Sequence, residues 1–487
     1  MIKLFDSIIL IMPILSLICS IIIIFYISFY KKNLFLESII VICGLLFSIM
    51  IILYLKVFML EYVSELIKID QYSYFYIFML LFSSLCTCIF AYPWMLYRNM
   101  YSTEFYSFIL LSTIGGILVS IAFNFSTLFI GIELLFFPIL GVLILFPKNK
   151  FNWSAILTYL VVSVFSSILL LLGCSFIYFV SGRLCFSFFT YIFIYYPTIM
   201  YSSVVFFGLF MVLFSLFLKL SLFPLHIWAP DIYQYTNSCA LIYFSTITKI
   251  SILSFLVRFL YYIPYLNKIK IIFNILYCVA IFSLLFGNLV AALQNKIQRL
   301  IGYLSISNLG FLLILIITYS QKENIYMTKY INIYIFGYLI GLLGFFGIKS
   351  IIDFNILIKN IHDTKNNSLT GLFWYDPILG IMMTIILLSL SGFPITIGFW
   401  GKFFVFKHLV YKNFFITVIC MMLSSIVGTY SYLNIIYSLY CKQPVELKKT
   451  HVSNRLNVTI LQKYLVICIG VILILLGFFP QFLYDFF

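Results

Sequence analysis

Long apolar blocks dominate this chain and restrict what it can fold into. Each block has about 20 residues or more, which is the length that an α-helix needs to cross a hydrocarbon core of roughly 30 Å. Short polar stretches separate the blocks. The pattern predicts an all-α polytopic membrane protein with about 14 transmembrane helices.

The composition agrees with a membrane protein. Hydrophobic residues make up 64% of the chain, charged residues only 9%, and the mean hydropathy is +1.17, whereas soluble domains carry about 25% charged residues. The net charge of +15 comes from Lys and Arg spread thinly over short loops, so it indicates membrane topology and not a nucleic-acid partner. We expect membrane lipid to surround the chain.

The basic residues also predict the orientation. Loops that follow odd-numbered spans hold more Lys and Arg than the loops on the side of the termini. Because short cytoplasmic loops carry the excess of positive charge, we expect both termini on the periplasmic or intermembrane-space side.

The 11 cysteines do not form a metal-binding pattern. Several lie inside apolar blocks, and there is no paired CxxC set. Cys86 and Cys88 are too close together and too isolated to make a metal site on their own. We expect buried free thiols and no metal site in this chain.

Two predicted spans carry Phe-Pro in mid-membrane, at Pro224 and Pro394. Proline removes a backbone donor and breaks or kinks a helix, and a functionless kink is an alternative for either span alone. Two breaks that lie five spans apart indicate inverted repeats instead. We predict three N-terminal helices in 1–100, repeats of five helices in 104–262 and 269–440, and a last helix in 462–487.

A few ionisable residues lie deep in the predicted spans. Glu133 is the acidic residue nearest a span centre, and Lys219, Lys249 and Lys402 are the deepest cations. Each charge at the bilayer centre costs about 2.5–3.5 kcal/mol, which disfavours an idle role. A desolvated Lys219 near Glu133 could load and release a proton, and a fixed salt bridge between these two residues is the alternative. The row of one carboxylate and three lysines favours the proton carrier, because a salt bridge explains only two of the four.

Other polar residues in the spans are weaker candidates. His226 could join a proton relay or cap carbonyl groups freed at the break, and the polar face formed by Ser305, Ser307 and Asn308 fits a water path or tight helix packing. The remaining cations in or near spans lie close enough to span ends to extend their charges into water; they are Lys56, Arg258 and Lys349.

Four motifs in order carry a resemblance to a known family: FLKLSLFPLHIWAPDIYQ (217–234), STITKISIL (245–253), GNLVAALQNKIQRLIGYLSISNLGFLL (287–313) and LSLSGFPITIGFWGKFFV (388–405). The chain resembles the antiporter-like subunits of respiratory complex I over roughly residues 104 to 440. PDIYQ and the lysine at 402 make it similar to the chain 2 type of NADH:ubiquinone oxidoreductase, the counterpart of the bacterial N subunit.

The resemblance implies a role for each deep charge in proton translocation. Glu133 would modulate Lys219, Lys249 would connect the path in mid-membrane, and Lys402 would serve the other half-channel. NAD, FMN, iron–sulfur clusters and ubiquinone would bind partner subunits and none would bind this chain. The partners would be other membrane-arm subunits, including other antiporter-like ones.

The chain departs from the family pattern in two places. The run QYTNSCA (234–240) replaces the usual continuation of the seventh-span motif, and Asn308 stands where the family usually has histidine. An amide cannot take up a proton, so a relay through the tenth span would need water or another residue.

Two other functions compete with this interpretation. One is a cation/proton antiporter subunit without a redox partner, and the other is a structural spacer that has lost transport. Heavy use of Phe, Tyr and Ile is typical of an AT-rich genome, so we expect the mitochondrial inner membrane, with a bacterial plasma membrane as the alternative.

Overall fold

The computed structural model describes residues 2–30, 33–58, 61–98, 102–145, 151–186, 188, 203–262, 270–319, 326–358, 369–441 and 459–480. Nearly all of these residues are helical, and the sheet within them is one two-stranded hairpin. In these ranges, 13 helices are long and apolar enough to cross a membrane.

The prediction of an all-α protein with about 14 spans is confirmed. The predicted twelfth span is the one missing from the 13 long helices, because it is divided into two shorter ones. The repeat boundaries at 104–262 and 269–440 stay a prediction.

Contacts divide the chain into two compact units. The first comprises Met1–Ser221 and Tyr243–Asn274, and the second comprises Leu222–Ile242 and Ile275–Phe487. The elements up to the first break are α1 (Ile2–Tyr30), α2 (Leu34–Val57), β1 (Tyr62–Val63), β2 (Lys68–Ile69), α3 (Gln71–Arg98), α4 (Ser102–Ile121), α5 (Phe125–Leu145), α6 (Phe151–Ser181) and α9 (Ser203–Leu220). The later elements are α10 (Trp228–Tyr235), α11 (Ser238–Tyr262), α12 (Lys270–Ala292), α13 (Ile297–Tyr319), α14 (Tyr326–Ile358), α15 (Leu372–Tyr375), α16 (Pro377–Ser391), α17 (Ile397–Tyr411), α18 (Phe415–Tyr440) and α19 (Ile460–Phe478).

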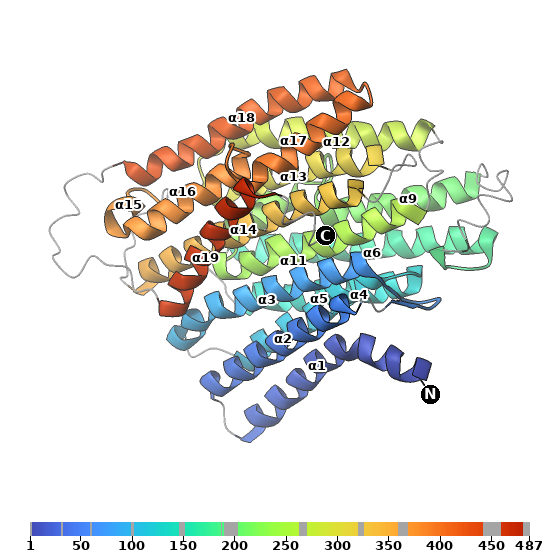
Figure 1. Ribbon diagram of the computed structural model, residues 1–487, viewed down its shortest axis with the longest axis horizontal. Coiled ribbons are helices and arrows are strands. Elements are labelled where there is room, and N and C mark those ends of the chain that lie inside the picture. The colour runs from blue at the N-terminus through green and yellow to red at the C-terminus, as the bar shows by residue number, and fades with distance from the viewer. Residues whose placement is uncertain are drawn as a thin grey trace. The chain divides into compact units, whose positions relative to one another are not determined.

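Glycines allow the helices of the first unit to pack closely. α3, α4 and α5 lie side by side (Figure 1), and a Cβ on Gly115 of α4 would collide with the backbone of Leu134 and Leu135 of α5. Gly173 of α6 and Gly208 of α9 face each other in the same way. Such contacts between small residues are how helices associate in lipid, where no hydrophobic effect holds them together.

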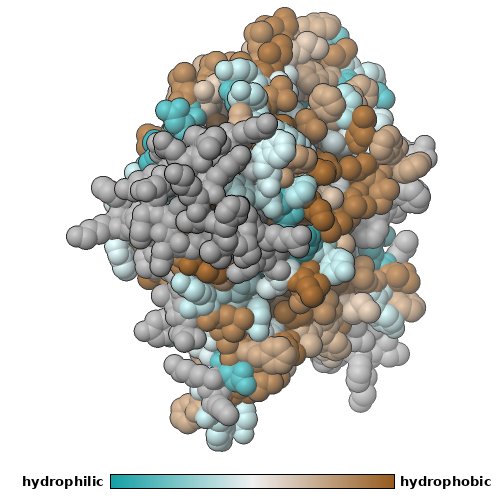
Figure 2. All heavy atoms as spheres, turned by 90° about the vertical axis from the view of Figure 1, so that its left-hand side faces the viewer, coloured by the Kyte–Doolittle hydropathy of each residue, from teal (hydrophilic) through white to brown (hydrophobic). Residues whose placement is uncertain are grey.

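In the second unit, α13 and α14 are the deeply buried helices. In each of them, 94% of an 18-residue apolar stretch is buried inside the protein. α16, α17 and α19 pack against α14. Figure 2 looks onto the side where α15 and α18 end and shows polar residues mixed with hydrophobic ones. This mixture is what a face at helix ends, near water, requires.

Both predicted helix breaks are present. α9 ends at Leu220 and α10 begins only at Trp228, with Pro224 between them. α16 ends at Ser391, and α17 begins at Ile397, with Pro394 between them. Gly392 ends α16 in a left-handed conformation, with φ of 82°, which glycine adopts at little cost.

α19 closes the second break from one side. Its Gly477 lies so close to the carbonyl of Ile395 that a Cβ would collide with it, and the carbonyl of Gly477 accepts a 2.7 Å hydrogen bond from the indole of Trp400. Irregular backbone at membrane depth needs such protein partners because lipid supplies none.

This close packing predicts a large effect of Gly398→Ala. A Cβ at Gly398 would collide with the carbonyl oxygen of Ser389, so α17 would have to move away from the end of α16. We expect a cost of about 1–3 kcal/mol, seen as a lower thermal midpoint and less assembled protein on native gels. The matched control is Gly116→Ala, where the nearest atoms would lie 3.4 Å away. Equal stability of the two variants would contradict the interpretation.

Candidate functional site

Lys219 occupies the last turn of α9 and is buried. Its Nζ is enclosed and has no hydrogen-bond partner. It lies 3.9 Å from the centroid of the Phe136 ring, close enough for a cation–π interaction. The ammonium group is therefore held by an aromatic face and is not fixed by an acceptor.

Glu133 lies one turn before Phe136 on α5. Its Oε1 is enclosed without a hydrogen-bond partner, and its charge interacts with Lys219. Among the described residues, Lys219 forms no ion pair within 4.0 Å. The structure thus brings these two predicted residues into electrostatic range but not into direct contact.

Lys249 lies near the middle of α11 and is buried. Every residue in an 18-residue apolar stretch of α11 is buried inside the protein. The structure therefore places this lysine away from the surface, as its position in the sequence predicted.

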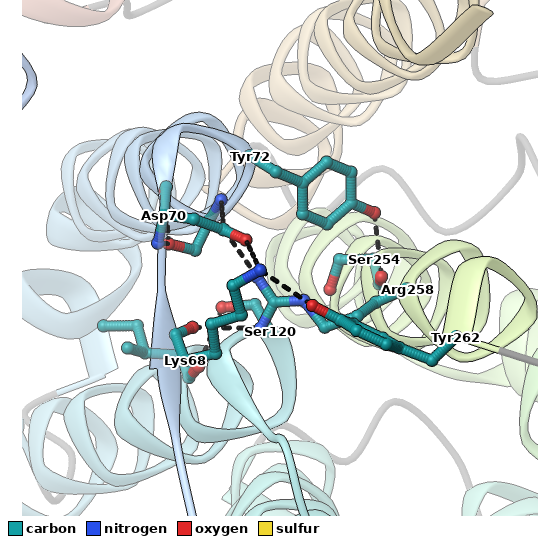
Figure 3. A network of polar contacts seen from close by, with 9 residues as sticks. Lys68, Asp70, Tyr72, Ser120, Ser254, Arg258 and Tyr262 are labelled. Carbon is teal, nitrogen blue, oxygen red and sulfur yellow. Dashed lines mark hydrogen bonds and ion pairs between the residues drawn. The ribbon is translucent and has the colours of Figure 1, made fainter. Parts of the chain in front are cut away.

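The expectation that Arg258 and Lys349 extend into water is wrong. Both are buried, and the side chain of Arg258 is only 3% exposed. Arg258 donates to Asp70 at 2.8 Å and to the carbonyl of Lys68 at 3.0 Å (Figure 3). Its partners are Lys68 of the hairpin and Asp70, which lies between the hairpin and α3. The position of Arg258 along its own helix did not reveal them.

Figure 3 shows that this network joins the end of α11 to the hairpin. Lys68 donates to the hydroxyl of Tyr262 at 2.7 Å and lies 3.4 Å from Asp70. Burial lowers the pKa of Lys68, but the hydrogen bond to Tyr262 and the charge of Asp70 outweigh it and raise the pKa above its usual value. The ammonium group therefore stays charged at neutral pH, and the network fixes the end of the helix that carries Lys249.

Lys402 lies in α17, just after the second break. Its Nζ donates a 2.7 Å hydrogen bond to the carbonyl oxygen of Ser391, the last residue of α16, and lies 5.4 Å from the centroid of the Phe311 ring. The break frees that carbonyl from the helix, and the lysine satisfies it. The C-terminal end of a helix also favours a positive charge electrostatically.

A small cavity lies beside Lys402. Its volume is about 10 Å³, close to the minimum that one water molecule requires. The residues around it are Asn308, Tyr334, Gly337, Tyr338, Ser389, Leu390, Gly398 and Lys402. The structure therefore brings Asn308 and Lys402, both predicted from the sequence, to one polar space.

The other relay candidates separate in the structure. Ser305 lies beside the hydroxyls of Tyr233 and Tyr338, whereas Ser307 packs against Gly287 of α12. His226 lies beside the backbone of Pro224. Its ring packs against aromatic rings, and the centroid of the Phe286 ring lies 4.9 Å from that of the imidazole. The position of Ser307 favours helix packing, and that of His226 is compatible with capping the break.

The sequence interpretation missed the tyrosines around Asn308 and the acceptor of Lys402. With 38 tyrosines in the chain, residue type did not single out Tyr334 or Tyr338. Within the described residues, no group of three or more His, Cys, Asp or Glu side chains could hold a metal ion.

Comparisons with known proteins give a consistent result. Residues 122–428 match the family described as NADH:quinone oxidoreductase/Mrp antiporter, TM. The NADH-quinone oxidoreductase subunit N of Buchnera aphidicola subsp. Acyrthosiphon pisum (strain APS) is 35% identical over 476 residues, covering 96% of each chain.

Solved structures share the fold. A chain of respiratory complex I from Thermus thermophilus superimposes with a TM-score of 0.78 at 19% identity, covering 96% of this chain and 97% of that chain. A chain of the Mrp complex from Dietzia sp. DQ12-45-1b does so with a TM-score of 0.82 at 14% identity, covering 97% and 95%.

The network around Arg258 predicts that Asp70→Asn destabilises the protein. The change leaves a guanidinium group that is 3% exposed without its counter-charge, and breaking a buried pair costs about 3–5 kcal/mol. We expect a clear fall in the thermal midpoint. The control is Asp231→Asn. The carboxylate of Asp231 lies 3.5 Å from the guanidinium group of Arg299, whose side chain is 36% exposed, and an exposed pair contributes only about 0–1 kcal/mol. Similar midpoints for the two variants would refute the anchoring role.

Proposed function

Because the chain belongs to the NADH:quinone oxidoreductase/Mrp antiporter family, we propose that it is the antiporter-like, proton-translocating N subunit of a respiratory NADH-quinone oxidoreductase. In this role it couples NADH oxidation and quinone reduction, which occur in other subunits, to proton movement across the membrane. Sequence similarity to a named subunit N over nearly the full length supports this assignment.

We place proton loading in the first unit at Lys219. The observation that carries this proposal is the enclosed amine of Lys219, which interacts with Glu133 through charge but has no hydrogen-bond partner. A fixed salt bridge would be expected in direct contact. With the carboxylate at a distance, a small displacement of Glu133 changes how strongly the ammonium form is favoured, so the lysine loads or releases a proton.

We assign Lys249 the connecting role in mid-membrane and Lys402 the second loading site. The contact of Lys402 with the carbonyl of Ser391 supports a link between its protonation and the break. An ammonium group binds this carbonyl more strongly than a neutral amine does, so proton loss loosens the joint between α16 and α17. A loosened joint gives water or a proton donor easier access to Lys402.

The redox chemistry belongs to partners in this proposal. NAD, FMN, iron–sulfur clusters and ubiquinone bind other subunits, and this chain contributes the proton path. Other membrane-arm subunits, including other antiporter-like ones, surround it together with lipid. Many large apolar side chains on α1, α2 and α18 are exposed in the isolated chain, which supports contact with lipid or other apolar subunits.

We propose the bacterial plasma membrane as the location. The relative that is 35% identical comes from a bacterium, and the expectation of a mitochondrial inner membrane gains no support from it. The distribution of Lys and Arg supports termini on the periplasmic side.

The antiporter without a redox partner is the second candidate function. One family includes both NADH:quinone oxidoreductase and Mrp antiporter chains, and the fold is shared with a chain of the Mrp complex, so this alternative stays open. Native-gel separation with an NADH-dehydrogenase stain distinguishes them. Migration of this chain with the stained band supports the respiratory assignment, and migration apart from it supports the antiporter. The structural spacer would predict normal pumping after replacement of the deep lysines.

Substitutions at Lys219 distinguish a proton carrier from a fixed charge. Arginine keeps the positive charge but retains its proton, whereas methionine removes the charge at similar volume. We expect Lys219→Arg and Lys219→Met both to lower NADH-driven pumping by about tenfold or more. The measurement is acidification of reconstituted vesicles by the assembled complex.

The control for this experiment is Lys407→Met, which removes an exposed lysine from α17 and should leave pumping unchanged. If assembled Lys219→Arg complex pumps as well as the parent, then Lys219 is a structural charge and the carrier role is wrong.

A further inference from the structure

Buried hydroxyl groups lie beside Asn308 and Ser305 inside the second unit. They come from α10, α13, α14 and α18, and their side chains are all buried. We call this group the hydroxyl cluster; its members are Tyr233, Ser305, Tyr334, Tyr338 and Tyr432. Such a density of polar groups in a membrane interior is costly unless the groups bind one another or serve transport.

The cluster continues from one member to the next. The hydroxyl of Tyr334 donates a 3.2 Å hydrogen bond to Oδ1 of Asn308, and Tyr432 lies beside the same amide. On the other side, Tyr338 lies close to Ser305. Asn308 and Ser305 are neighbours on one face of α13 because they are three residues apart in a helix.

The cluster reaches Lys402 through the small cavity. Tyr334, Tyr338 and Lys402 all line this space, whose volume of about 10 Å³ lies at the lower limit for one water molecule. A water there would find polar partners in a phenol, an amide and an amine, as a buried water requires. Three residues with hydroxyl groups line the cavity beside Lys402: Tyr334, Tyr338 and Ser389. The hydroxyl of Ser389 donates to the carbonyl of Ile386 within its own helix at 2.9 Å, which leaves the two tyrosines as the relay candidates.

The chemistry of the side chains decides which of them can relay a proton. The amide of Asn308 does not take up a proton, so it orients its neighbours and does not carry the charge. A phenol hydroxyl both donates and accepts. In one step its oxygen accepts a proton from one side while its own hydrogen passes to the next oxygen, and rotation of the hydroxyl restores the starting state.

We propose that Tyr334 and Tyr338, with one water in the cavity, relay protons to and from Lys402. Asn308 Oδ1 holds the hydroxyl hydrogen of Tyr334 between transfers, and the hydroxyl turns from Asn308 to the water when it donates its proton. The inference rests on the proposed function and deepens it, because it names the relay groups that serve Lys402. A merely structural cluster would fill the same space and satisfy the same hydrogen bonds without affecting proton transfer.

The test uses the Tyr334→Phe, Tyr338→Phe double variant in the intact complex. Phenylalanine keeps the rings and removes both hydroxyls, so we expect NADH-driven proton pumping to fall by about tenfold or more. NADH oxidation with a soluble electron acceptor should be unchanged. The matched control is Tyr243→Phe, which removes a buried hydroxyl that donates to the carbonyl of Ile109 at 3.0 Å outside the cluster, and it should pump normally.

Rescue separates a relay from packing. An imidazole can accept and donate protons at neutral pH, so Asn308→His in the double variant should restore pumping in part. Normal pumping by the assembled double variant would overturn the inference, and so would a loss that matches the loss of assembled complex. If Lys402→Met abolishes pumping while the double variant pumps normally, only the relay is wrong. If Lys402→Met also pumps normally, the proposed function itself fails.

Discussion

The hydrogen bond from Lys402 to the carbonyl of Ser391 shows the constraint on which the rest of the site depends. A backbone carbonyl that leaves a helix inside a bilayer finds no water, so the protein must supply a donor. Here the donor is a lysine whose own charge needs an acceptor at the same depth. The two costly features offset each other, and the break and the half-buried amine support one another.

The charged groups of the first unit are held in two different ways. Arg258 contacts Asp70 directly at 2.8 Å, and this pair fixes the end of α11 to the hairpin. The amine of Lys219 lies 3.9 Å from the centroid of the Phe136 ring and interacts with Glu133 only through charge. A direct, hydrogen-bonded pair resists change in its protonation, whereas an amine without an acceptor responds to the position of a nearby charge. This difference in contact is the physical reason for assigning one pair to structure and the other to transport.

Much of the candidate site could be predicted because its signals are local. A proline in an apolar run marks a broken helix, and a lysine in mid-span is costly wherever the helix packs. These signals identify Pro224, Pro394, Lys219 and Lys402. The burial of Arg258 does not follow from them because its partner lies 188 residues away in the sequence. Distance from a helix end says how far a side chain must reach for water, but not which neighbours it meets first.

The sequence by itself determined the class of protein, the number of spans, the places where two of them break and the burial of Lys219 and Lys249. These follow from hydropathy, proline geometry and the cost of charge in lipid, which depend only on nearby residues. Only the tertiary structure decided that Ser307 faces α12 while Asn308 faces a cavity with Lys402, and that Tyr334 belongs beside them. The reason is that packing against other helices sets the rotation of each helix about its axis. This rotation determines which of many similar tyrosines lie at the site.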